Sequence, residues 1–342
     1  EKTRQYDLGL DMDMFNYRLN VKLDYYYKYT SSLIYDIPIP GSLYAFGAQV
    51  ENAMEISNEG LELELQADIL RESAVSWRMK FNMARNWNRF EKSYSGKDVV
   101  DGDGTLLVVG RPLNGLYVWA HRGYYNSDAE VPRLYKIDGQ EIYFNGVATN
   151  GISGAVGDYR LLDLDGDGNP DSYYAGSPLP LAHGGWVNEL MWKNFDLNVL
   201  VNFTIGRKMI NNRMGLGFSR QSEDGHLTKL FDYRKLRPWD GVNKKPNAPA
   251  WGNSLSMNTD SAIEKVHHLA LKQITLGYNL PDRISKKAGL SGVRFFLTAE
   301  NLFYLSNYSG GNPEVVNIYT GRDNGDTYPL PRKYTLGLTL NF

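Results

Sequence analysis

The chain has 342 residues, which is enough for two or three ordinary domains or for one large all-β domain. Its 37 basic and 39 acidic residues nearly cancel, which argues against nucleic acid as a partner. The lack of cysteine excludes disulfides, thiol chemistry and thiolate zinc sites. No run approaches the roughly 20 apolar residues of a transmembrane helix, but a membrane β-barrel stays possible because its strands alternate polar and apolar residues.

The N-terminal quarter of the chain alternates apolar and polar side chains over four segments. Alternate side chains of a strand point to opposite faces, so each segment predicts a strand with one apolar face. Short turns at about 15–18 and 71–73 close two hairpins, and a loop rich in Pro, Gly and Ser separates them at about 30–53. The predicted strands are 6–14, 19–29, 61–69 and 75–87.

The rest of the chain continues this pattern with longer connections. Short turns are expected at about 193–194 and 281–291. The long irregular segments cover about 96–183, 207–265 and 306–331. The predicted strands are 186–192, 195–205, 274–278, 293–300 and 332–342.

Two regularities predict the fold class. Short and long connections alternate along all nine predicted strands, as do the short periplasmic turns and long extracellular loops of outer-membrane barrels. Trp77 and Trp87 share a parity ten residues apart, about 33 Å, which suits two aromatic girdles on a tilted strand. Arg85 on the same face is tolerable only near an interface, where its side chain can reach polar surroundings. The sequence therefore predicts an all-β, transmembrane antiparallel β-barrel.

The two faces of the strands are expected to meet different surroundings. In the last strand Tyr334, Leu336, Leu338, Leu340 and Phe342 share one parity and are predicted to face lipid. The charged side chains of the opposite parity would line a wet lumen, and no single one indicates selectivity. They are Lys22, Glu62, Glu64, Asp68, Arg78, Lys80, Arg294 and Glu300.

Five segments in order along the chain resemble the SusC/RagA-type TonB-dependent transporters. The similarity covers nearly the whole chain and is weakest in the two longest loops. The segments are GLDMDMFNYRLNVKLDYYYKYTSSLIYDIPIP from Gly9, NEGLELEL (58–65), KQITLGYNLP (272–281), GVRFFLTAENLFYLSNYSGGNPEV (292–315) and YPLPRKYTLGLTLNF (328–342).

The resemblance implies a 22-stranded barrel in the outer membrane of a Gram-negative, Bacteroidota-type bacterium. Such a barrel carries an N-terminal plug, imports glycan oligosaccharides or peptides with energy from TonB, and works with a SusD-like surface lipoprotein as a lid. Residues 1–342 would be the C-terminal part of it, without the plug, the TonB box and the first strands. TonB would then act through a part outside this chain, and the nine strands would form an incomplete barrel.

The same resemblance gives expectations for individual parts of the chain. The long loops at about 30–53, 96–183, 207–265 and 306–331 are expected outside the cell, with 96–183 and 207–265 contacting the lid. Phe342, aromatic at the end of an amphipathic strand, resembles the signal that the barrel-insertion machinery reads.

The sharpest local motif predicts a calcium loop. Oxygen-bearing side chains and a Gly at 168 follow the spacing of the first part of an EF-hand loop, and Tyr174 replaces the usual glutamate at its end. The alternative is an acidic turn without metal. The expected ligands are Asp163, Asp165, Asp167, Asp171 and the carbonyl of Asn169. No organic cofactor is expected.

Other chemistry is weakly indicated. None of the five histidines, at 121, 183, 226, 267 and 268, has zinc-type spacing, no G-x-S-x-G motif occurs, and Asp101–Gly104 indicates a turn. The chain is therefore not expected to be an enzyme. An outer-membrane barrel enzyme and a passive porin stay as alternatives to an importer. Loop aromatics could stack on sugars, pack on a partner or fold back on the loops; they are Trp119, Tyr124, Tyr125, Tyr173, Tyr174 and Trp239.

Overall fold

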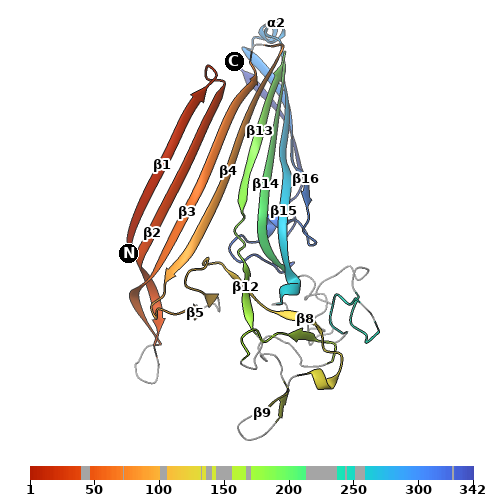
Figure 1. Ribbon diagram of the computed structural model, residues 1–342. Helices are drawn as coiled ribbons and strands as arrows, with labels where there is room; N and C mark the ends of the chain where they lie inside the picture. The colour runs from red at the N-terminus through yellow and green to blue at the C-terminus, as the bar shows by residue number, and fades with distance from the viewer. Residues whose placement is uncertain are drawn as a thin grey trace.

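Long antiparallel strands dominate the computed structural model. It describes residues 1–39, 47–71, 73–100, 106–131, 133–135, 141–143, 156–166, 171–212, 237–242, 245–250, 259–325 and 327–342. Within these residues nine long strands form one sheet in chain order (Figure 1). They are β1 (Lys2–Met14), β2 (Leu19–Pro38), β3 (Ala48–Leu70), β4 (Val75–Lys92), β13 (Ala182–Trp192), β14 (Phe195–Asn211), β15 (Ile263–Asn279), β16 (Gly292–Ser306) and β18 (Lys333–Asn341).

The sheet is a partial barrel wall. Each long strand pairs antiparallel with the next, and in the described residues β1 and β18 have a partner on one side only. A short strand, β17 (Arg322–Asp323), adds to the end of β14 in parallel. The prediction that these strands do not close on one another is confirmed. No helix in the described residues is long and apolar enough to cross a membrane.

Strand register gathers the apolar parity on one face, as predicted. Leu336 is opposite Leu297, and Leu338 is opposite Phe295. These side chains stay exposed in the isolated chain, with Leu336 81% accessible, as a lipid-facing surface requires. A single row of paired residues, called here the apolar row, crosses eight strands of this face. It consists of Leu10, Leu23, Leu63, Met83, Gly184, Phe203, Leu269 and Leu305.

On the opposite face, two glycines allow aromatic rings to lie against the backbone of the neighbouring strand. A Cβ on Gly60 would lie 2.5 Å from Cζ of Tyr26, and one on Gly337 would lie 2.0 Å from Cζ of Phe296. Both rings therefore occupy space that any other residue would fill. Each pair joins directly opposed residues of adjacent strands, β2 with β3 and β16 with β18.

Connections divide the wall into a turn end and a loop end (Figure 1). At the turn end, Phe15, Asn16 and Tyr17 take left-handed φ angles of 53°, 56° and 61°, and Arg18 N donates to Met14 O at 3.1 Å. The longest turn there carries α2 (Asp282–Ser285) and the 3-10 helix η4 (Lys286–Ala288). The predicted alternation of short and long connections holds except at the loop end between β2 and β3, where residues 39–47 make a shorter connection than the turn at 280–291.

Two bulges let strands extend into predicted loops. The prediction of an irregular loop at about 30–53 is wrong, because β2 runs to Pro38 and β3 begins at Ala48. Ser32, with φ of 56°, lies in a bulge that interrupts the pairing of β2 with β3 and shifts the alternation. Pairing resumes at Leu33. Likewise a shift in register around Gly206, with φ of 73°, carries β14 on to Asn211.

The remaining long segments fold into short elements at the loop end. The pairs of small strands are β5 (Val99–Val100) with β6 (Leu106–Leu107), β7 (Leu116–Trp119) with β12 (Ser172–Gly176), β8 (His121–Tyr124) with β11 (Tyr159–Leu161), and β9 (Arg133–Tyr135) with β10 (Glu141–Tyr143). The 3-10 helices are η1 (Asp128–Glu130), η3 (Asp260–Ala262) and η5 (Pro313–Val315).

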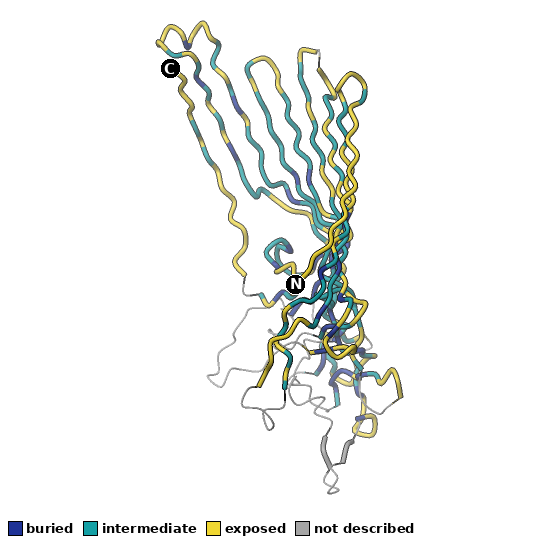
Figure 2. Tube along the Cα trace, turned by 90° about the vertical axis from the view of Figure 1, so that its left-hand side faces the viewer, coloured by how far each residue is buried: buried dark blue, intermediate teal, exposed yellow. Residues whose placement is uncertain are grey.

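Apolar burial is concentrated at this loop end (Figure 2). In one cluster Met209 and Val266 of the wall pack against Tyr308 and Val316 of the segment between β16 and β18. In another, Ile210 packs against residues of β7. The long strands of the wall instead leave most of their apolar face accessible, which is the inverse of a soluble domain.

Candidate functional site

The polar face of the wall is lined by charges that pair across strands. Arg78 Nε lies 2.7 Å from Asp68 Oδ1, Lys80 Nζ lies 2.8 Å from Glu189 Oε1, and Lys333 Nζ lies 3.6 Å from Glu300 Oε2. Each pair joins a basic side chain of one strand to an acidic side chain of the next, so the face has no single sign.

The other charged side chains predicted for this face also lie on it. Arg294 Nε donates to Asp196 Oδ1 at 3.2 Å. Lys22 is opposite Glu64, and Glu62 lies next to them along β3. A wall of mixed charge and amide groups stays wet and can hydrogen-bond passing ligands without selecting for one charge.

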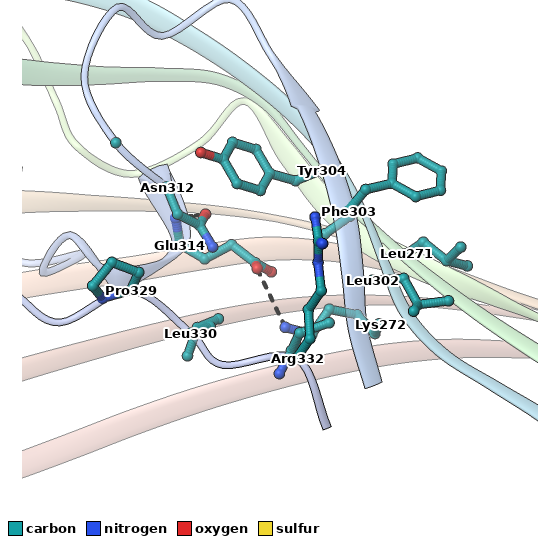
Figure 3. A pocket seen from close by; sticks show the side chains of 13 residues that line it. Leu271, Lys272, Leu302, Phe303, Tyr304, Asn312, Glu314, Pro329, Leu330 and Arg332 are labelled. Atoms are coloured by element: carbon teal, nitrogen blue, oxygen red, sulfur yellow. Dashed lines mark hydrogen bonds and ion pairs between the residues drawn. The ribbon is translucent and has the colours of Figure 1, made fainter. Parts of the chain in front are cut away.

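A cavity of about 230 Å³ lies at the loop end, between β15, β16 and the segment that leads to β18 (Figure 3). Lys272 and Arg332 bring two cations to its lining, Glu314 brings one carboxylate, and Tyr304 brings an aromatic ring. Lys272 Nζ lies 3.2 Å from Glu314 Oε2. The carboxylate is therefore engaged by a cation, which leaves the cavity a surplus of positive charge together with ring and amide groups.

Glu314 is held ionised by its neighbours. His268, whose Nε2 lies 3.7 Å from Glu314 Oε1, is the main cause that lowers the pKa of Glu314 to about 2, and Lys272 adds to the effect. Burial opposes this shift. Glu314 lies in η5, whose N-cap residue Asn312 accepts from the Glu314 backbone N–H through its side chain at 3.0 Å. The carboxylate thus ties the segment between β16 and β18 to the middle of β15.

A buried arginine fastens the same segment to β14. The Arg207 side chain donates to the carbonyl oxygens of Pro313, Val316 and Asn317 at 3.2, 2.9 and 2.6 Å. Only 5% of Arg207 is accessible. No pattern in the sequence indicates this contact, because its partners are backbone atoms more than 100 residues away.

A second contact between distant residues joins the two longest connections. His121 of β8 is hydrogen-bonded to Asp260 of η3 through its Nδ1, and Tyr173 donates to the other oxygen of Asp260 at 3.2 Å. Ser261 donates to Tyr159, not to the histidine. Although serine, histidine and aspartate meet here, the described residues do not order them as a nucleophile, base and orienting acid.

Most of the predicted loop aromatics are used within the loops. Tyr124 stacks on Tyr159 with ring centroids 5.4 Å apart, and Tyr125 is only 3% accessible. The Arg111 guanidinium lies 4.8 Å from the ring centroid of Tyr174. Burial raises the pKa of these tyrosines, consistent with a packed layer.

The loop aromatics at the edges of this layer keep partners as well. Tyr173 stays 37% accessible beside Asp260, and Trp239 Nε1 donates to Asn126 at 3.1 Å. Trp119 packs against the buried pair of Tyr159 and Leu161. Folding back of the loops on themselves, one of the three roles left open by the sequence, is therefore what these contacts show.

Comparison with known proteins identifies the family. A sequence model described as "TonB dependent receptor-like, beta-barrel" matches residues 1–174, half of the chain. The chain belongs to the TonB-dependent receptor β-barrel family. TonB-dependent receptor P26 of Formosa agariphila is 29% identical over all of this chain and 34% of its own length. TonB-dependent receptor SusC of Bacteroides thetaiotaomicron is 26% identical over all of this chain and 32% of its own length.

Solved structures agree on the fold of this TonB-dependent receptor chain. The structure of the RagAB peptide transporter matches with a TM-score of 0.75 and 24% identity, over 99% of this chain and 35% of that one. The chain thus spans about a third of the length of the relatives it matches. The predicted resemblance to the SusC/RagA type is confirmed, and the protein is an outer-membrane β-barrel protein of the Bacteroidota type.

The acidic turn of this receptor chain brings three predicted calcium ligands together. Carboxylate oxygens of Asp163, Asp165 and Asp171 all lie within 4.8 Å of one another. Asp163 Oδ1 also accepts from Gly166 N at 2.6 Å, so it shapes the turn as well. Convergent hard oxygens fit calcium. Asp167 and Asn169 lie outside the described residues, and calcium at this turn stays a prediction.

The other sequence-based candidates are placed without forming a site. His183 and His267 are exposed, and His268 contacts Glu314. His226 and the turn at 101–104 lie outside the described residues. Phe342 is 93% accessible, and its role as an assembly signal stays a prediction.

Proposed function

We propose that this chain is the C-terminal part of the barrel of a TonB-energised importer of large nutrients, either glycan oligosaccharides or peptides, and that it works with a SusD-like lipoprotein lid. The observation that carries the proposal is the polar, charge-balanced face that runs along a wall of this family. Such a face suits ligands rich in hydroxyl, amide and mixed charged groups. The likeness to the RagAB peptide transporter supports peptides as one class of cargo.

The proposed route of the cargo begins at the loop end. The cavity of Lys272, Glu314 and Arg332 lies there, and its surplus cation suits a carboxylate or a polar hydroxyl group of the cargo. The long connections lie at the same end, where a lid would close over the wall (Figure 1). Loops of this length that fold on their own short strands usually carry binding function.

Uptake by whole cells tests the proposal. Cells that carry the receptor are given fluorescent oligosaccharides or peptides, with and without an uncoupler that abolishes energy supply to TonB. An importer accumulates its cargo only when energised. Accumulation that continues under the uncoupler would indicate a passive porin, and cleaved cargo in the medium of transport-deficient cells would indicate an enzyme.

A matched pair of variants tests the cavity. Arg332→Gln removes a cation from the lining, and a charged hydrogen bond is worth about 1.5–3 kcal/mol, so cargo affinity should fall roughly tenfold or more. Arg283→Gln removes an exposed cation in α2 at the turn end and should leave affinity unchanged. Equal affinity in both variants would remove the cavity from the proposed route.

The lid is tested by co-purification. A lipoprotein partner should be retained by the intact receptor and lost when the connection between β4 and β13 is shortened. Shortening the turn between β3 and β4, at the other end of the wall, is the control. Retention of the partner after the first change would contradict docking at the loop end.

A further inference from the structure

A second cavity, of about 410 Å³, is lined by three cations. Arg85 comes from β4, Lys208 from β14 and Lys265 from β15. None of the described residues that line this cavity is acidic. In the described residues no ion pair joins any of the three to a carboxylate, unlike the paired charges of the polar face. We call these three residues the outer cation cluster.

Two members of the outer cation cluster are placed where they repel each other. Lys208 and Lys265 are directly opposite in the pairing of β14 with β15, and like charges at such positions are destabilising. Lys208 is also confined, because its stem crosses Gly176, where an added Cβ would lie 2.7 Å from Lys208 Cγ. An anion bound between the two side chains would relieve this repulsion.

Register places the cluster on the outward face, just beyond the apolar row. Arg85 has the parity of Met83, a member of that row. Val266 points inward, where it packs against Tyr308 in the apolar core of the loop end. Its neighbour Lys265 therefore points outward. On β4, β14 and β15 the outward side chains therefore change from apolar to cationic at about the same level. This level is the loop-end border of the lipid-facing band.

The surroundings of the cluster suit an amphipathic ligand. The Arg85 guanidinium lies 4.3 Å from the ring centroid of Trp87, which orients the cation at the position expected for an aromatic girdle. On the membrane side, Phe81 stacks on Phe203 at 5.8 Å, and Trp186 packs on the same ring at 6.3 Å. Cations thus border the loop end of an aromatic surface.

We propose that the outer cation cluster binds the phosphate groups of an anionic glycolipid in the outer leaflet, with acyl chains lying over Phe81, Trp186 and Phe203. Basic pockets at a membrane border recognise anionic headgroups in this way. The phosphates would neutralise the repulsion between Lys208 and Lys265. This inference rests on the position of the wall in the membrane and does not depend on the imported cargo.

The experiment measures binding of phosphorylated lipid A, used as the probe, to receptor purified in a neutral detergent. The variant R85Q/K208Q/K265Q removes the cluster. The control R283Q/K286Q/K287Q removes three exposed cations from α2 and η4 at the turn end. A cation beside an anionic lipid surface is worth about a fivefold change in affinity. The triple variant should therefore bind roughly a hundredfold more weakly, and the control should bind like the wild type.

Three outcomes would overturn the proposal. The first is equal binding by the triple variant and the wild type. The second is equal binding of dephosphorylated lipid A, which would indicate that no lipid phosphate is recognised, or full displacement of the lipid by inorganic phosphate, which would indicate a site for free phosphate and not for a lipid. The third is loss of a co-purified lipoprotein with unchanged lipid binding, which would assign the cations to a protein partner.

A single substitution keeps the test valid if the triple variant folds poorly. K208Q relieves the cross-strand repulsion, so its unfolding temperature in neutral detergent should equal or exceed that of the wild type. Phosphorylated lipid A should raise the unfolding temperature of the wild type more than that of K208Q. A lower unfolding temperature of K208Q in neutral detergent, with an equal lipid-dependent rise, would show a structural role for Lys208 and contradict the proposal.

Discussion

The wall and the loop end are held together in different ways. In the wall, each residue faces a partner fixed by register, and members of the apolar row repeat from strand to strand. At the loop end a few contacts between distant residues hold each segment, such as His121 with Asp260 and Arg207 with the carbonyls near η5. We infer that damage to the wall acts on the whole barrel, whereas damage at the loop end releases one segment.

The largest effect is expected for a charge on the apolar row. Leu63→Arg places a cation on the lipid face of β3, between the bilayer midplane, where such a charge costs about 2–4 kcal/mol, and the loop-end border, where it costs less. Gln66→Arg, three residues away on the polar face, should cost far less. Urea unfolding in lipid vesicles measures both. Similar losses of stability in the two variants would contradict the assignment of faces.

A methyl group added to the wall should outweigh the same group added to a loop. In Gly184→Ala the Cβ would lie 2.0 Å from the backbone oxygen of Asn82, so β13 and β4 must separate. Overpacking of this kind costs about 1–3 kcal/mol. In Gly47→Ala the Cβ meets nothing within 4 Å. The unfolding free energies of the two variants are then compared. A difference close to zero would contradict the expectation that the wall is more sensitive to an added methyl group than the loop.

Acid should release one loop segment before it affects the wall. Because the folded pKa of Glu314, about 2, lies below its ordinary value near 4.5, the stabilisation is present above about pH 4.5 and is lost as the pH falls toward 2. Limited proteolysis with an acid-active protease should then cut between β16 and β18 first. Glu314→Gln should give that cleavage already at neutral pH, at a cost of roughly 1 kcal/mol. Simultaneous cleavage of the wall would contradict independent release.

The smallest effect is expected for calcium at the acidic turn. At a concentration equal to its dissociation constant, an ion stabilises its site by about 0.4 kcal/mol. Hydrogen exchange of residues 163–166 and 171 should slow when calcium is added and recover with a chelator. Asp163→Asn with Asp165→Asn should remove this response. Exchange that ignores calcium would favour the metal-free acidic turn.

The wall could be predicted from the sequence because its signal is local. Alternation over about ten residues identifies both the strand and its two faces, and Trp77, Leu336 and Arg294 lie on the faces expected for them. The prediction fails at bulges. At Ser32 the alternation shifts by one residue, so a paired strand has the pattern of a loop. Parity counted from each side of such a position would have recovered the strand.

The contacts of the loop end could not be predicted in the same way. His121 and Asp260 are 139 residues apart, and no repeat or spacing links them. The calcium motif was visible because its carboxylates lie within one turn. Only one member of the outer cation cluster could be singled out from the sequence, because Arg85 is a charge on an apolar face. Its association with Lys208 and Lys265 depends on the pairing of three strands.

The aromatic rings that lie over Gly60 and Gly337 limit the ways in which neighbouring strands can align while the barrel is being built. A slip of two residues preserves the faces but places Phe296 against Thr335 or Thr339, whose branched side chains fill the space that the ring needs. This clash disfavours a misaligned register within the two paired strands themselves, before further strands are added. We therefore expect each of these pairs to reach its register during insertion without help from a third strand.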